Sequence, residues 1–180
     1  MLMNHAQAVQ QYGSDYRLKQ AVGRGEIYKI ERGIYSSAPQ VNPFTLLMYK
    51  YPGAVLTMNT AFFIHGLTDV IPQSVYVATG RGATRIRDPR IVQVFSEERL
   101  LTAGKVSGRF DGADIWLYNL ERMLVEAMRN ASALPPDYYR EIIGSYRRRA
   151  DELDIRLVEE YMRLFERNAF MQDILQREVL

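Results

Sequence analysis

Hydrophobic residues near the start of the chain recur at helical spacing. Residues 4–12 form a first helical pattern, and Leu18, Ala21 and Val22 lie on one face of a second. Ser14 can cap the second helix, because its hydroxyl accepts a backbone N–H that has no partner in the first turn. The pattern therefore predicts two short helices in succession.

Strand-forming residues follow the second helix directly. Gly25 favours the left-handed conformation that ends a helix, and residues 27–30 and 34–36 are rich in β-branched and aromatic side chains. The residues between these two runs suit a three-residue hairpin turn with Gly33 at positive φ. Because two helices and a hairpin in this order are typical of a winged helix-turn-helix, we predict such a domain, in an abbreviated form, over residues 1–37.

The rest of the chain, residues 38–180, alternates between strand-like and helical segments before it becomes helical. An Asn-Pro pair at 42–43 is typical of a helix start, and an Asp-Gly pair at 111–112 favours a type I′ hairpin. Strand-like runs lie at 55–57, 75–79, 91–95 and 115–118. A helical pattern starts at 43 and is stopped by a Pro-Gly pair at 52–53, and others lie at 59–65 and from 119 onward. We predict an α+β chain whose mixed sheet-and-helix domain, over 38–180, ends in a helical C-terminal tail.

The composition is that of a globular protein, with 180 residues, 47% hydrophobic content and a net charge of +2. A net charge this small does not identify a nucleic-acid-binding protein. An argument for nucleic-acid binding therefore depends on local clusters of cations. Without cysteine, and with two histidines, the chain offers no good metal site, and we expect no cofactor. It has no apolar run of about 18 residues and no hydrophobic signal region, so we expect a cytoplasmic protein without a membrane partner.

Cationic and amide side chains gather on the outer face of the predicted second helix and on the hairpin. The forked groups of Arg17 and Gln20 can pair with base edges, and the other cations could reach phosphates. The candidates for DNA contact are Tyr16, Arg17, Lys19, Gln20, Arg24, Lys29 and Arg32. The alternative is an ordinary solvated helix beside a surface hairpin.

A second group of cations follows a predicted strand in a glycine-containing loop, and consists of Arg81, Arg85, Arg87 and Arg90. These arginines could hold an anion, although a simple surface loop is an equal alternative. The loop lacks the P-loop and dinucleotide-binding fingerprints. His65 is expected to cap its own helix, and Glu121 and Glu126 are five residues apart and do not share a helix face. We therefore expect no catalytic residue and no enzymatic activity.

Four segments of the chain resemble AbiEi-type antitoxins, the regulatory partners in type IV toxin–antitoxin systems: residues 25–35, 57–68, 74–79 and 120–126. The resemblance implies that the first domain represses its own operon by binding inverted repeats in double-stranded DNA. It also implies that the second domain neutralises a nucleotidyltransferase-like toxin in phage defence, without a stable complex. Two-fold repeats require two subunits or two bound copies, so we expect a monomer or a weak dimer.

Two other functions of the second domain remain open at this point. It could bind a nucleotide or act as an enzyme, with Arg85, Arg87 and His65 near a phosphate. It could instead be a protein-interaction module whose helical tail binds the toxin directly.

Overall fold

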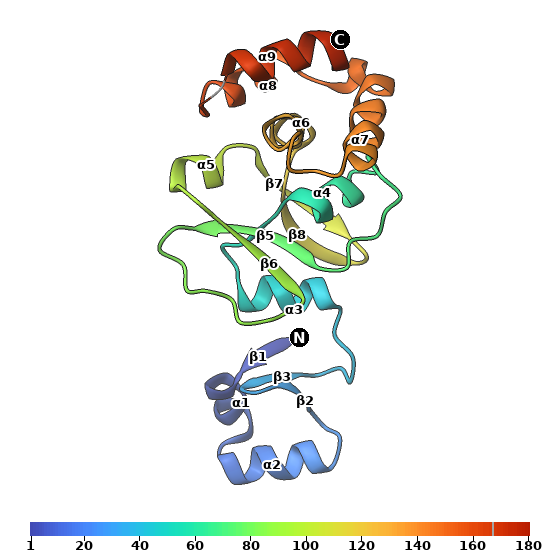
Figure 1. Ribbon diagram of the computed structural model, residues 1–180. Coiled ribbons are helices and arrows are strands. Elements are labelled where there is room, and N and C mark those ends of the chain that lie inside the picture. Colours follow the sequence, from blue (N-terminus) through green and yellow to red (C-terminus); the bar gives the residue numbers. More distant parts are fainter. Residues whose placement is uncertain (167) are drawn as a thin grey trace. The chain divides into compact units, whose positions relative to one another are not determined.

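The computed structural model describes residues 1–166 and 168–180 (Figure 1). Its chain divides into two compact units. The first consists of Met1–Pro52 with Asp111–Asp114, and the second of Gly53–Phe110 with Ile115–Leu180. The first unit thus runs beyond Ser37, where the sequence predicts the domain boundary, and includes the next helix. Helices and sheets occur in both units, which confirms the α+β class.

The first unit, all of whose residues the structure describes, holds a three-stranded antiparallel sheet with the order β1-β3-β2. Its strands are β1 (Leu2–Asn4), β2 (Tyr28–Glu31) and β3 (Ile34–Ser36), and its helices are α1 (His5–Tyr12), α2 (Asp15–Gly23) and α3 (Pro43–Lys50). The helices α1 and α2 share a core with the sheet, formed by Met3, Ala8, Leu18, Ala21, Ile27 and Tyr35. This core fixes which face of α2 points inward.

Local signals set the ends of α2 and the hairpin as predicted. The hydroxyl of Ser14 accepts the backbone N–H of Arg17 at 3.2 Å, which confirms the N-cap. Gly25 and Gly33 have φ angles of +71° and +76°, in the left-handed region that glycine adopts at little cost. The helix therefore ends, and the hairpin turns, where the sequence places these events.

The second unit is built on a mixed sheet whose described strands have the order β6-β5-β4-β8-β7. They are β4 (Val55–Leu56), β5 (Val75–Gly80), β6 (Ile91–Ser96), β7 (Lys105–Phe110) and β8 (Ala113–Tyr118). Strand β4 runs antiparallel to β5 and parallel to β8, and β5 runs parallel to β6. Asp111 and Gly112 both have positive φ, +48° and +77°, which confirms the type I′ turn between β7 and β8.

Helices cover this sheet and continue to the end of the chain. They are α4 (Met58–Ile64), α5 (Glu98–Thr102), α6 (Leu120–Arg129), α7 (Pro136–Arg148), α8 (Ile155–Met162) and α9 (Asn168–Ile174), with a 3₁₀ turn at Ala150–Glu152 and a π-helical turn at Leu175–Val179. Figure 1 shows α6 end-on, with the sheet on one side and the C-terminal helices on the other. Every residue of α6 from Arg122 to Met128 is buried. Hence α6 is the centre of the second unit rather than a surface helix.

Two further features concern the described residues, 1–166 and 168–180. None of their helices combines the length and the apolar character that a bilayer crossing requires. Their His, Asp and Glu side chains form no group of three or more that could hold a metal ion.

His65 makes a different contact from the one the sequence predicts. His65 occupies the C-cap position of α4, but its ring nitrogen Nε2 lies 2.7 Å from the backbone oxygen of Tyr118 on β8, so the side chain bonds to another element and not to its own helix. Because a carbonyl oxygen only accepts, Nε2 carries the proton in this bond. Burial of the ring lowers the pKa of His65, and the nearby charge of Arg149 acts in the same direction.

This lowered pKa makes the stability of the second unit depend on pH. As the pH falls, the unfolded chain takes up a proton at His65 near pH 6.5, and the folded chain takes it up only at a lower pH. The contribution of the neutral His65 to the free energy of unfolding is therefore complete above pH 6.5 and is lost as the pH falls through the lower pKa that His65 has in the folded chain. We expect the free energy of unfolding to decline from pH 7 to pH 5, and to decline less in His65→Gln, whose amide N–H can replace Nε2–H.

Urea unfolding followed by tryptophan fluorescence measures this effect, because the single tryptophan, Trp116, lies in the second unit. The matched control is His5→Gln, which changes the other histidine, in the first unit. Identical pH profiles for the wild type and His65→Gln would contradict the assignment.

Candidate nucleic-acid interface

The face of α2 that points away from the core carries Tyr16 and Gln20. Leu18 is 2% exposed and marks the inward side of the helix. At about 100° per residue, side chains two positions before and after it point about 160° away. Tyr16 is 70% exposed, and Nε2 of Gln20 donates to its hydroxyl at 2.9 Å. We call these two exposed side chains the α2 ridge.

Cations flank the α2 ridge on both sides. Arg17 and Arg24 project on one side of it and Lys19 on the other, and all three are exposed. The guanidinium of Arg17 points back toward the N-terminus of the helix and lies beside Gly13. Its Nη1 is 3.5 Å from the position that a Cβ atom would take if Gly13 were another residue. Among the residues described, neither Arg17 nor Lys19 forms an ion pair, so both charges are available.

Arg24 differs because it is paired with Glu26. Its Nε lies 2.7 Å from Oε1 of Glu26, and its Nη2 lies 3.5 Å from Oε2. The two side chains are 61% and 48% exposed, and an exposed pair of this kind contributes only about 0–1 kcal/mol. A phosphate could therefore replace Glu26 as the partner of Arg24.

Removal of this carboxylate should strengthen DNA binding. In Glu26→Gln we expect about two- to fivefold tighter binding, because the variant releases Arg24 and removes a negative charge near the approaching phosphates. Fluorescence anisotropy with a labelled duplex measures the dissociation constant. Glu160→Gln, which changes another exposed glutamate on α8, is the matched control. Unchanged affinity in Glu26→Gln, or equal tightening in the control, would argue against DNA contact at Arg24.

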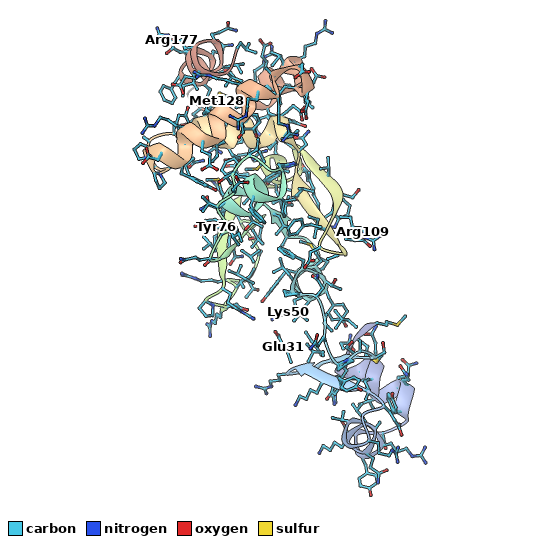
Figure 2. The ribbon with its side chains drawn as sticks, turned by 90° about the vertical axis from the view of Figure 1, so that its right-hand side faces the viewer. Glu31, Lys50, Tyr76, Arg109, Met128 and Arg177 are labelled. Atoms are coloured by element: carbon cyan, nitrogen blue, oxygen red, sulfur yellow. The ribbon has the colours of Figure 1, made fainter. Side chains whose placement is uncertain are left out.

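The hairpin presents the last two candidates. Lys29 is paired in register with Tyr35, a core residue, so it emerges at the edge of the sheet face that α1 and α2 cover. Arg32 lies exposed in the turn. Glu31 is bound instead to α3, with its Oε2 2.6 Å from Nζ of Lys50, and Figure 2 shows these two residues side by side. This ion pair ties the end of β2 to α3.

All seven candidates predicted from the sequence are exposed. On α2, Tyr16 and Gln20 form the central ridge and Arg17 and Arg24 lie on one flank of it. Lys19 lies on the opposite flank of the same helix, and Lys29 and Arg32 belong to the hairpin. The surface is thus open and cationic, and its contact with DNA stays a prediction.

The four arginines of the arginine loop, residues 81–90, differ in the partners that they have in the structure. Its outer members are held in ion pairs, Arg81 with Glu97 at 3.1 Å and Arg90 with Asp88 at 2.7 Å. In the described part of the chain Arg85 and Arg87 have no carboxylate partner, and both are exposed. The backbone N–H of Ile86 donates to Oε1 of Gln93 at 2.7 Å, which anchors the middle of the loop to β6. Anion binding here stays a prediction.

Sequence reasoning missed a buried charge network on α6. Nε and Nη2 of Arg122 donate to Oε1 of Glu126 at 3.1 and 2.8 Å, and Nη1 donates to the backbone oxygens of Leu100 and Ala103 at 2.8 and 2.9 Å. Oε2 of Glu126 accepts from Nη1 of Arg129 at 2.9 Å. The signal in the sequence was an Arg and a Glu four residues apart with apolar neighbours between them. We call Arg122, Glu126 and Arg129 the α6 charge network.

No protein-family model matches the chain, and no curated protein matches it significantly. The AbiEi resemblance therefore depends on the sequence segments given above.

Proposed function

We propose that the chain is a DNA-binding regulator of the AbiEi type, and that its first unit binds operator DNA through α2 and the β2–β3 hairpin. In this proposal α1, α2 and the sheet act as a winged helix-turn-helix, with α2 as the recognition helix and the hairpin as the wing. The observation that carries the proposal is the open, cation-flanked α2 ridge, where Arg17 and Lys19 have no acidic partner among the described residues.

Each candidate has a role that follows from its chemistry. Arg17 can donate two parallel hydrogen bonds to guanine, and Gln20 can pair with adenine once DNA replaces its bond to Tyr16. The remaining cations would contact phosphates, which fix the position of the protein and account for most of the affinity: Lys19, Arg24, Lys29 and Arg32.

The second unit, in the same proposal, neutralises a nucleotidyltransferase-like toxin in the cytoplasm without a stable complex and without enzymatic activity of its own. The support is the resemblance of residues 57–68, 74–79 and 120–126 to AbiEi-type antitoxins. We expect the adjacent gene to encode a nucleotidyltransferase-like toxin whose growth arrest is relieved by co-expression of this chain, and continued growth arrest would contradict the antitoxin role.

DNA binding is tested with a duplex from the region upstream of the chain's own gene. A scrambled duplex of equal length and composition, without inverted repeats, is the control. We expect the upstream duplex to bind about a thousandfold more tightly at physiological salt. Equal affinity for both would contradict a sequence-specific regulator, and no binding to either would contradict DNA binding altogether.

A further inference from the structure

Strand β6 lies at one edge of the second unit's sheet, and among the described strands it pairs with β5 alone (Figure 1). The backbone oxygens of Arg90 and Ser96 accept N–H groups from β5 and from the residue that follows it, so the even-numbered residues of β6 point toward β5. The backbone N–H and C=O groups of the odd-numbered residues therefore point away from the sheet. These residues are Ile91, Gln93 and Phe95.

The outward backbone groups of β6 are largely unpaired. Among the residues that the structure describes, the N–H and C=O groups of Gln93 and Phe95 that point outward have no hydrogen-bond partner. The N–H of Ile91 donates to the backbone oxygen of Asp88 in the preceding turn at 3.0 Å, which leaves the oxygen of Ile91. A row of unpaired backbone groups of this kind is a template for another strand.

Strand β6 also lacks the features that protect other edge strands of this chain. Residues 91–96 carry no charge and no proline, and they pair with β5 without a bulge. At the opposite edge of the same sheet β7 carries Lys105 and Arg109, and in the first unit β2 carries Lys29 and Glu31 and has a shift in its register. Because charges and irregular register keep edge strands from pairing, β6 is the described edge most suited to accept a further strand.

The sequence of β6 is complementary to itself when two copies run antiparallel. With Gln93 opposite Gln93 of the second copy, Val92 lies opposite Val94 and Ile91 lies opposite Phe95. The two Gln93 residues would then exchange both of their backbone hydrogen bonds, and the N–H of Phe95 would donate to the oxygen of Ile91. Val92, Val94 and Phe95 are 37%, 40% and 45% exposed, so this pairing covers apolar surface on both faces of the sheet.

Charged residues at the two ends of β6 match in the same orientation. Arg90 precedes the strand, with Asp88 before it, and Glu97 and Glu98 follow the strand, with Arg99 after them. An antiparallel copy brings Arg90 toward the two glutamates and Asp88 toward Arg99, whereas a parallel copy would place Arg90 beside Arg90. Arg90 is 74% exposed and already bonds to Asp88 at 2.7 Å, so each added contact contributes no more than about 1 kcal/mol. The charges thus favour the antiparallel direction but add little strength.

We propose that β6 pairs antiparallel with β6 of a second copy of the chain, which joins the sheets of two second units across a two-fold axis at Gln93. The interface is isologous, because the same strand serves both copies. Since a six-residue strand covers little surface, the dimer is weak, with a dissociation constant on the order of 10–100 μM. The proposal does not rest on DNA binding, although two joined copies are the number that an inverted repeat requires.

Sedimentation of the full chain at about 1–500 μM tests the association, since this range spans the expected dissociation constant. We expect the weight-average mass to rise from that of one chain toward that of two. The mass of one chain at every concentration would overturn the proposal. Growth beyond two chains would also overturn it, because a two-fold pairing closes the exposed edge of both copies.

Amide hydrogen exchange locates the contact. We expect the N–H groups of Gln93 and Phe95 to exchange more slowly at high protein concentration than at low concentration, because the pairing gives both of them an acceptor. Unchanged exchange at these two residues in a sample that dimerises would show that the contact lies elsewhere and would overturn the proposal.

Val92→Lys is expected to weaken dimerisation at least about tenfold. The variant loses the apolar pair with Val94, and each new lysine lies diagonally across the axis from the same lysine of the second copy. Val106→Lys is the matched control, because it makes the same change at a 38% exposed valine on β7, at the opposite edge of the sheet. Wild-type association in Val92→Lys, or equal weakening in Val106→Lys, would overturn the proposal.

Val92→Lys combined with Val94→Glu tests the register. Pairing centred on Gln93 places the two new charges opposite each other, so we expect association to recover to within about threefold of the wild type. A centre at Val92 or Val94 would instead place like charges opposite each other. Val92→Lys combined with Val94→Lys is the control and should stay monomeric. Failure of the first combination to recover, or equal recovery in the second, would overturn the proposed pairing.

Discussion

Replacement of Arg17 and Lys19 together by alanine is expected to weaken binding to the upstream duplex by about thirty- to a thousandfold. A base pair recognised by two hydrogen bonds from Arg17 contributes about 1–3 kcal/mol, and the phosphate contact of Lys19 adds to it. Both side chains are exposed and lie off the core of the first unit, so the free energy of unfolding should change by no more than about 0.5 kcal/mol.

Fluorescence anisotropy at about 0.1 M salt measures this loss, since salt sets the strength of phosphate contacts. The matched control is Arg156→Ala with Arg163→Ala, which removes the same charge from exposed positions on α8 and at its C-cap. An equal loss in the control would show that net charge alone attracts DNA. Wild-type affinity in the Arg17 and Lys19 variant would contradict recognition through α2.

Arg122→Ala is expected to lower the free energy of unfolding of the second unit by about 3–5 kcal/mol. Arg122 is 2% exposed and donates to Glu126 and to two backbone oxygens. Its removal leaves those oxygens without a donor and takes away two of the hydrogen bonds to a carboxylate that is 7% exposed. Urea unfolding followed by Trp116 fluorescence measures the change.

Two comparisons separate this effect from a general loss of arginine. Arg140→Ala removes an arginine that is 75% exposed and should change stability by no more than about 0.5 kcal/mol. Arg122→Met combined with Glu126→Leu removes both charges and should recover most of the loss, because no buried carboxylate is left short of partners. A loss below about 1 kcal/mol in Arg122→Ala would show that the network does not stabilise the fold.

The sequence predicts those features of the fold that depend on neighbouring residues. The Ser14 cap, the Gly33 turn and the Asp111-Gly112 hairpin are all as predicted, because each depends on the conformations open to a few adjacent residues. The start of α3 at an Asn-Pro pair is of the same kind, and Asn42 accepts the backbone N–H of Phe44 at 2.8 Å.

Long-range pairing is what the sequence does not reveal. Strand β1 is three residues long and exists because it pairs with β3, with Met3 opposite Tyr35. In the parallel pairing of β4 with β8, Leu56 lies opposite Leu117, which is 61 positions later in the sequence (117 − 56 = 61). No local pattern specifies such partners, so the order of the second sheet could not be predicted.

Burial of α6 was underestimated for a related reason. The sequence predicts a helix from residue 119 onward but not its full burial, whereas contacts from the sheet and from the C-terminal helices bury Arg122 and Glu126 as well. In the candidate interface, helical spacing in the sequence predicts which cations of α2 lie on its exposed side. The pairing of Glu31 with Lys50 did not, because it depends on where α3 packs.

The salt dependence of binding to the upstream duplex tests the central claim most directly. If Lys19, Arg24, Lys29 and Arg32 of each bound copy contact phosphates, the slope of log affinity against log salt is about −3.6 per copy, and affinity falls about a hundredfold between 50 and 200 mM salt. Lys29→Ala should make this slope shallower by about one. An affinity that does not change with salt, or no binding at 50 mM, would contradict DNA recognition by the first unit.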